Sequence, residues 1–259
     1  MLNQVFSDYF AQRRNYLTEI DARIKIVSVA AAIVITILSQ NIYTPLIVFL
    51  FTLIFVLSIS IPVKVILIRL VTPLGIAGTI LLMQIFFYGE TAIVRFDLWG
   101  IHLVGYKEGL LRGSLIMAKV IGTTSLVIFL SMTTSVNKLL NAARWFKVPN
   151  TWVEIAVFSY RYIFVLLEDV ITVRDAQEVR LGYSSLARSL RSFGELMGAT
   201  VIRAYDHSVS AYEAMILRGY NGTARNIVWE EKFGAKDAIV ALVFIIILAS
   251  LLVLSIVLH

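Results

Sequence analysis

Five long apolar stretches, separated by shorter polar segments, set the pattern of this chain. Each comes close to the roughly 20 apolar residues that a helix needs to cross the hydrocarbon core of a bilayer. The pattern predicts spanning helices at 25–40, 43–61, 66–88, 113–132 and 237–258. Small residues on these stretches are expected where helices pack closely, among them Gly75, Gly78, Gly113 and Gly122.

The stretch 133–236 has another pattern and is too polar to consist of simple spanning helices. A first helix is expected to begin at Ser135 and to end before a Val-Pro pair that interrupts it. Thr151 and Glu154 have the spacing of a capping box, which predicts the start of a second helix that Gly182 ends. We therefore expect a helical cytoplasmic platform that is partly embedded in the membrane.

A third helix of this platform is predicted at 195–218. Its apolar residues recur at alternating three- and four-residue steps, which places them on one face of a helix. They are Ile202, Tyr205, Val209, Tyr212 and Ile216, and a polar line beside them is formed by Arg203, Asp206, Ser210 and Glu213. Such a helix has a solvent-facing or partner-facing side and is too polar to span a membrane alone.

Two segments of the platform repeat one small pattern. Ala176 and Arg180 share a helix face, as do Ala214 and Arg218, because each pair is four residues apart. A glycine follows each arginine within two residues, as is usual just past the end of a helix. One such arginine is explained by the helix dipole alone. Two matching copies favour a second use, in which the planar guanidinium groups dock on carboxylates of a partner protein.

Composition also indicates a membrane protein. Of the 259 residues, 59% are apolar and 15% are charged, whereas soluble domains are about half apolar and about a quarter charged. We expect an all-α, polytopic membrane protein with about five transmembrane helices and a cytoplasmic helical coupling domain. The expected division is 1–132 for the first four spans with the N-terminal segment, 133–236 for the platform and 237–259 for the last span.

Basic residues gather on one side of the predicted spans. They precede the first span, lie between the second and third, and recur through 133–236. The positive-inside rule places these segments in the cytoplasm, so the N-terminus is inside, while the C-terminus and the loop 89–112 are outside. The net charge of +6 is then an orientation signal and does not indicate nucleic-acid binding. The polar start, 1–16, predicts no cleavable signal peptide.

Several kinds of chemistry lack their residues in this sequence. The chain has no cysteine, which excludes thiolate catalysis and cysteine-ligated metal sites. It has no Gly-x-x-x-x-Gly-Lys-Ser/Thr loop, so hydrolysis of ATP by that route requires a partner protein. The histidines His102, His207 and His259 are far apart in the sequence. No catalytic residue, metal site or cofactor is therefore predicted.

Lys119 lies inside the fourth predicted span. An ionisable residue at such a place is by default a sign of function, although a long lysine side chain also reaches nearby polar surfaces. We expect a structural or partner-facing role for Lys119 rather than ion conduction, because no acidic residue within the spans lines up with it.

Three segments carry a family pattern: YRYIFVLLE at 160–168, RLGY at 180–183 and AMILRGYNG at 214–222. Shorter matches are Asp21-Ala22-Arg23, Glu108-Gly109-Leu110, Thr133-Thr134 and Val148-Pro149. In these residues the chain resembles, over nearly its whole length, the CbiQ family of transmembrane coupling (T) components of energy-coupling factor (ECF) transporters. The sequence departs from the family signature where Val179 and Leu217 replace an Ala before each arginine, and where Leu181 separates Arg180 from its glycine.

The resemblance implies a non-catalytic subunit of a prokaryotic cell-membrane importer for cobalt or nickel ions. Its implied partners are membrane lipid, two cytoplasmic CbiO-like ATPase subunits and a CbiM-like substrate-binding membrane subunit, with a small CbiN-like subunit as a further candidate. The implied ATPase-docking residues are Arg180, Gly182, Ala214, Arg218 and Gly219. The apolar line Ile202, Tyr205, Val209, Tyr212 and Ile216 is expected to pack the coupling helices on each other or on a partner.

Three alternatives stay open. A vitamin importer with the same coupling logic would change only the cargo. A self-contained secondary transporter would need polar residues that converge at mid-membrane, often in matching halves, and the sequence shows no inverted repeat. A membrane enzyme would need a catalytic set, and the tight acidic pair Glu168-Asp169 is explained more simply as part of a solvated helix face.

Overall fold

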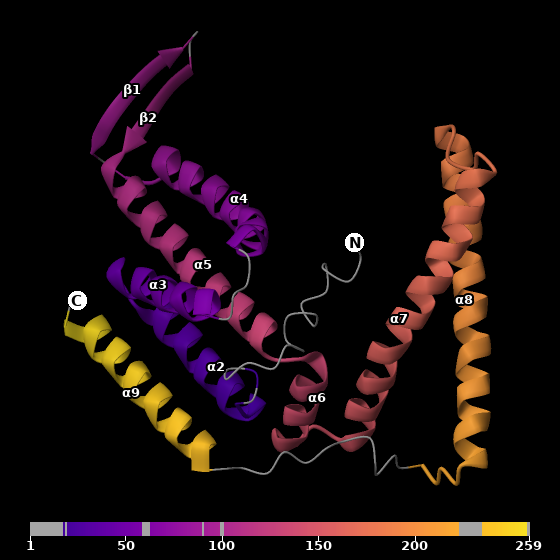
Figure 1. The fold of residues 1–259 in the computed structure, drawn as a ribbon. Helices are drawn as coiled ribbons and strands as arrows, with labels where there is room; N and C mark the ends of the chain where they lie inside the picture. Colours follow the sequence, from indigo (N-terminus) through magenta and orange to yellow (C-terminus); the bar gives the residue numbers. More distant parts are fainter. Residues whose placement is uncertain are drawn as a thin grey trace. The chain divides into compact units, whose positions relative to one another are not determined.

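The computed structural model describes residues 18, 20–58, 63–89, 91–98, 101–222 and 235–257. These residues fall into two compact units, one within Met1–Leu139 and Glu231–His259 and the other within Leu140–Glu230. The expectations for 1–16 and for His259 lie outside the described residues. Apart from one β-hairpin, the regular structure of the described residues is helical (Figure 1), which confirms the all-α class and adds a hairpin that was not predicted.

Five helices of the first unit coincide with the predicted spans. They are α2 (Ala22–Leu38), α3 (Tyr43–Ser58), α4 (Val63–Phe87), α5 (Lys107–Thr133) and α9 (Ala235–Val257). By length and composition, two helices among the described residues could cross a membrane, Lys64–Phe87 and Lys107–Thr133. The helix α5 begins earlier than predicted, because the hairpin of β1 (Ala92–Leu98) and β2 (Ile101–Tyr106) leads directly into it.

Close approaches of glycines fix how α3 and α4 lie against α5. A Cβ atom at Gly109 would overlap the carbonyl oxygen of Gln84, and one at Gly113 would lie 3.2 Å from Leu81 Cα. A Cβ atom at Gly122 would lie 2.9 Å from the carbonyl oxygen of Pro45. The end of α4 therefore meets the start of α5. The expected close packing at Gly113 and Gly122 is confirmed, whereas a Cβ at Gly75 or Gly78 would meet no described atom within 4 Å.

Contacts between helices show that sequence neighbours in this unit alternate in direction. Pro45, Thr52 and Phe55 of α3 meet Gly122, Ser125 and Phe129 of α5 in the same order, so α3 runs in the same direction as α5. Lys25 and Ile37 of α2 meet Thr133 and Lys119 of α5 in the opposite order, so α2 runs against both. The backbone N–H of Asp21 donates to Asp237 Oδ1 over 3.2 Å, at the start of α2 and of α9. Near the ends of these two helices, Asn41 Nδ2 donates to the Ser255 carbonyl. The starts of α2 and α9 therefore lie together.

The second unit contains two long helices, α7 (Asn150–Val179) and α8 (Leu186–Leu217), which α6 (Val136–Trp145) precedes. At 1.5 Å per residue they are about 45 and about 48 Å long. The predicted capping box is wrong, because Pro149 precedes the first helical residue and Thr151 already lies in the first turn. The helix α8 begins well before 195, because the Ser185 side chain caps it by accepting from Arg188 N–H.

Candidate functional site: the helix ends at Arg180 and Arg218

The two predicted arginines occupy the same position at the ends of α7 and α8. Each is the last residue before the chain turns away from its helix. At the first end, Gly182 N–H donates to the Gln177 carbonyl over 2.8 Å, and Leu181 N–H donates to that of Glu178 over 3.0 Å. Both bonds belong to a Schellman motif, the pair of backbone hydrogen bonds that commonly closes an α-helix.

The second end repeats these bonds one helix later. Tyr220 N–H donates to the Met215 carbonyl over 3.0 Å, and Gly219 N–H donates to that of Ile216 over 2.9 Å. We call residues 177–183 tip 1 and residues 215–220 tip 2. Because the bonding is the same, the backbones of both tips present Arg180 and Arg218 in the same way relative to their helices.

The residue that makes the left-handed turn differs between the tips. In tip 2 it is Gly219, with φ +80°, as a Schellman motif favours. In tip 1 it is Leu181, with φ +57°, and Gly182, which was expected just past the end of this helix, follows it. A side chain at positive φ is strained because its Cβ crowds the following carbonyl oxygen. The repeat is therefore aligned by the arginines, and the glycines are offset by one residue.

Gly182 is required in tip 1 for a different reason, which is its contact with α8. A Cβ atom there would lie 2.7 Å from Ser192 Oγ and 2.9 Å from the Gln177 carbonyl oxygen. Ser192 Oγ donates to the Gly182 carbonyl over 3.0 Å, and Gln177 Nε2 donates to the Ser192 carbonyl over 2.9 Å. Tyr183 Oη donates to Gln177 Oε1 over 2.8 Å. This network, which the sequence reasoning missed, holds tip 1 against α8.

Both tips expose an apolar side chain next to the arginine. Val179 is 85% exposed and Leu217 is 88% exposed, and the arginines and Ala214 are exposed as well. Within the part of the chain that the structure describes, neither Arg180 nor Arg218 forms an ion pair. Each tip thus combines an accessible guanidinium with an apolar neighbour, which is the chemistry of a docking surface for an acidic groove.

Asp169 joins α7 to α8 some distance from tip 1. Arg203 Nη1 donates to Asp169 Oδ1 over 3.0 Å, and His207 Nε2 lies 3.2 Å from Asp169 Oδ2. The hydrogen bond with His207, followed by the charge of Arg203, holds the pKa of Asp169 below its usual value. Asp169 and His207 were expected on solvated helix faces, and the structure shows them in an interhelical contact instead.

The predicted apolar line on α8 is not the side that α8 turns toward α7. Its five residues, Ile202, Tyr205, Val209, Tyr212 and Ile216, are 38% to 69% exposed. A groove of about 320 Å³ between the helices is lined from α8 by Ala204, Ser208, Ala211 and Met215 and from α7 by Ile155, Phe158, Ser159, Tyr162 and Leu166. That the apolar line packs on a partner protein stays a prediction.

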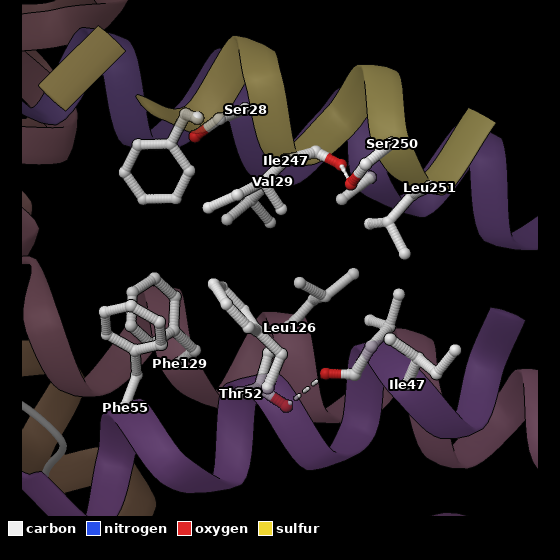
Figure 2. A pocket seen from close by; sticks show the side chains of 14 residues that line it. Ser28, Val29, Ile47, Thr52, Phe55, Leu126, Phe129, Ile247, Ser250 and Leu251 are labelled. Atoms are coloured by element: carbon white, nitrogen blue, oxygen red, sulfur yellow. Dashed lines mark hydrogen bonds between the residues drawn. The ribbon is translucent and has the colours of Figure 1, made fainter. Parts of the chain in front are cut away.

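The first unit contains an apolar pocket of about 190 Å³ (Figure 2). Ser28 and Val29 of α2, with Leu251 of α9, face Phe55 of α3 and Phe129 of α5 across it. The hydroxyls in its lining are hydrogen-bonded within the protein: Ser28 donates to the Ile24 carbonyl, Ser250 to the Ile247 carbonyl and Thr52 to Ser125 Oγ. The surface of the pocket is therefore mostly hydrocarbon, which does not suit the binding of a metal cation. No group of three potential metal-binding side chains occurs among the described residues.

Lys119 has a structural partner within the first unit. Its Nζ donates to the Ile37 carbonyl over 2.7 Å, close to the end of α2. The 17 residues of α2 span about 25 Å, less than the roughly 30 Å of a bilayer core. The last carbonyls of a helix lack intrahelical donors, and inside a membrane they need another partner. Lys119 supplies that partner, in agreement with the structural role expected for it.

Comparisons with known proteins place the chain in a family. A family model described as the CbiQ cobalt transport protein matches residues 13–228. An uncharacterized protein of Methanocaldococcus jannaschii is 30% identical over 241 residues, which are 92% of this chain and 90% of the relative. The cobalt transport protein CbiQ of Rhodobacter capsulatus is 33% identical over 96 residues, 37% of this chain and 39% of the relative.

A putative fused cobalt transport protein CbiMQ of Methanocorpusculum labreanum is also similar, with 26% identity over 211 residues, which are 80% of this chain and 35% of that protein. The family match includes both arginine-bearing tips and the helices that carry them. The resemblance seen in the sequence is therefore confirmed, and the chain belongs to the CbiQ family of cobalt transport proteins, the T components of ECF transporters.

Proposed function

We propose that this chain is the transmembrane coupling subunit of an ATP-driven importer for cobalt or nickel ions. Two cytoplasmic ATPase subunits bind tip 1 and tip 2, and ATP binding and hydrolysis in them move the tips. The helices α7 and α8 transmit this motion to the membrane bundle, where a separate substrate-binding membrane subunit is reoriented. The CbiQ family is generally a non-catalytic transport component, in line with this role.

The observation that carries the proposal is the matched presentation of two arginines. Arg180 and Arg218 end two long helices through the same pair of backbone hydrogen bonds, and both are exposed. A Schellman motif needs no arginine at this position, so helix termination does not account for the repeated residue. Two identical ATPase grooves would account for it.

The membrane arrangement proposed here is five crossings with the N-terminus in the cytoplasm. The alternating directions of the five helices support it, because a chain that crosses a bilayer repeatedly must reverse at each crossing. The lengths and apolar compositions of α4 and α5 also support it. Under this arrangement the hairpin of β1 and β2 lies outside the cell.

The proposed membrane partner is a CbiM-like subunit. The name of the Methanocorpusculum labreanum relative describes a fusion of two components, of which this chain matches one part. Fusion into one protein supports a physical association of the unfused components. The alternative cargo is a vitamin, which would leave the docking and coupling steps as proposed and replace the substrate-binding subunit.

The proposal is tested by affinity purification of the tagged chain from native membranes in mild detergent, followed by mass spectrometry. We expect an ATPase and a small membrane protein to copurify with the wild type. The double variant Arg180→Glu/Arg218→Glu should lose the ATPase while still inserting in the membrane. Arg191→Glu is the matched control, because Arg191 is an exposed arginine of α8 that lies outside both tips, next to Ser192, and pairs with Glu195.

Each result has a clear meaning. If the double charge reversal still copurifies with the ATPase, the docking role of the tips is wrong. A wild-type chain that comes out alone, and transports alone after reconstitution, would replace the proposal by a secondary transporter. A vitamin-binding protein in place of a metal-binding one would change the cargo and leave the mechanism.

A further inference from the structure

Lys25, near the start of α2, is fully buried, with none of its surface exposed. Its Nζ donates to the carbonyl oxygen of Thr133 over 3.1 Å. A buried lysine is rare, because removing an ammonium group from water is costly unless it is paired or hydrogen-bonded. The position of this side chain is therefore strongly constrained by what it contacts.

The contacted carbonyl lies where the chain leaves the membrane bundle. Thr133 is the last residue of α5, and its carbonyl is among the four that find no donor within the helix. A positive charge is also favourable at a helix C-terminus. Thr134 and Ser135 follow, and then α6 leads the chain into the second unit. Lys25 thus binds the end of α5, from which the chain leaves the bundle toward α6.

The same turn of α2 also holds α9. Asp21 Oδ1 accepts from Arg23 N–H and so caps α2, and Asp21 N–H donates to Asp237 in the first turn of α9. Two short motifs of the sequence, at 21–23 and at 133–134, are brought together in this way although 108 residues separate Lys25 from Thr133. Neither motif belongs to the tips, and the docking of ATPases uses neither.

Lys119 provides an internal comparison. It also donates to a carbonyl near the end of a helix, Ile37 of α2, so that α2 and α5 each supply a lysine to the C-terminal end of the other. The chain that follows Ile37 continues into α3 and stays within the first unit. Of these two contacts, that of Lys25 is the one at the exit toward the coupling helices.

We propose that Lys25 is a positioning residue that anchors the start of α6 to α2, so that movement of the coupling helices is delivered to the bundle. The inference rests on the proposed function, since it concerns how the motion of the tips is used. Lys138 Nζ of α6 also donates to the Thr18 carbonyl, over 3.1 Å, shortly before α2 begins. Loss of the Lys25 ammonium group therefore loosens the end of α5 and the start of α6 against α2 without freeing them, and ATP hydrolysis drives transport less efficiently.

The test compares Lys25→Met with Lys119→Met in the complete complex with its ATPase and substrate-binding subunits, reconstituted in vesicles. The first readout is uptake of radioactive Co²⁺ per ATP hydrolysed. The second is the mobility of a nitroxide on Asn137→Cys, an exposed position of α6 in a chain that has no other cysteine. Copurification of the ATPase is measured for every variant.

We expect Lys25→Met to keep its ATPase and to lower uptake per ATP about tenfold, the effect of losing one hydrogen bond to a charged group. The nitroxide at 137 should become more mobile. Lys119→Met should leave both readouts close to those of the wild type. If Lys25→Met does not insert, Lys25→Gln, which is shorter and carries an uncharged donor, is measured in the same way.

Unchanged nitroxide mobility in the Lys25 variant would overturn the inference. So would an equal loss of coupling in Lys119→Met, which would reduce both lysines to a shared structural role. A wild-type chain that binds no ATPase would refute the proposed function instead, and the nitroxide measurement would still decide whether Lys25 anchors α6.

Discussion

Tip 1 and tip 2 have the same pattern of backbone hydrogen bonds and differ in the contacts that stabilise it. Both close a helix with the same two hydrogen bonds and place an arginine at the same point. Tip 1 is then tied to α8 through Gln177, Gly182 and Ser192, and it tolerates a leucine at positive φ. Tip 2 has the expected glycine, and a Cβ atom on Gly219 would meet no described atom within 4 Å.

The comparison shows that one local motif can be stabilised in two ways. In tip 2 the choice of residue makes the left-handed turn easy. In tip 1 contacts with a neighbouring helix impose the turn on a residue that disfavours it. We infer that tip 1 is preorganised before its ATPase binds, whereas the position of tip 2 depends more on its partner.

Charge reversal at the tips should have the largest effect. Arg180→Glu and Arg218→Glu should each weaken ATPase binding by more than tenfold, because loss of one partner of a buried charge pair costs about 2–5 kcal/mol. If tip 1 is preorganised, Arg180→Glu should be the more damaging variant. Titration of purified ATPase onto the detergent-solubilised chain measures both, with Arg191→Glu as the control. Equal binding by all three variants would refute the docking role.

Alanine substitution of Gly182 and of Gly219 should distinguish stabilisation by contacts with α8 from stabilisation by a glycine at positive φ. Gly182→Ala should destabilise tip 1 by about 1–3 kcal/mol, because its Cβ would press on Ser192 Oγ and on the Gln177 backbone. Gly219→Ala should cost only about 1 kcal/mol, because its strain is limited to the positive φ. Hydrogen exchange of the amides in each tip reports these changes. A larger effect at Gly219 would reverse the comparison.

Leu181→Gly should act in the opposite direction. The left-handed leucine costs about 1–2 kcal/mol, and a glycine loses about 0.5–1 kcal/mol more in chain entropy on folding. Leu181 is 66% exposed, so little packing is lost. The net gain should lie between 0 and about 1.5 kcal/mol, seen as slower exchange of amides 177–183. Faster exchange would mean that the leucine side chain contributes to the tip.

The contact of Asp169 with Arg203 and His207 should have the smallest effect and should depend on pH. The pKa of Asp169 is lowered in the folded chain, so its contribution to stability is complete above the unfolded value of about 3.9. It is lost as the pH falls through the lowered value. The wild type should therefore be more stable than Asp169→Asn at pH 6, and the difference in unfolding midpoint should vanish in strong acid. A difference that persists there would have another cause.

The five apolar helices could be predicted because their signal is carried by the segments themselves. An apolar run of about 20 residues marks a spanning helix whatever it packs against. The two lysine contacts could not be found in this way. Lys25 and Lys119 bind backbone carbonyls, which any residue provides, at separations of 108 and 82 positions. No side chain at Thr133 or Ile37 signals the contact.

The tips and α8 show which features periodicity and capping rules predict and which they do not. The repeat located Arg180 and Arg218 correctly, since the four-residue spacing is local. The sequence did not indicate that Leu181, rather than a glycine, makes the left-handed turn of tip 1, because the network around Ser192 that accompanies it comes from α8. On α8 the apolar line was read correctly as a helix face, but small residues such as Ala204 and Ala211 form the side toward α7.

The reciprocal contacts of α2 and α5 also bear on how the chain is made. Under the proposed arrangement of five crossings, the first helix enters the membrane before α5, which binds both its Lys25 Nζ and its Ile37 carbonyl, has been synthesised. At about 5–20 residues per second, the ribosome needs roughly 5–20 s to reach Thr133 after Lys25. Throughout that interval α2 lacks its two hydrogen bonds to α5, and they form only when α5, the fourth proposed crossing, has been inserted.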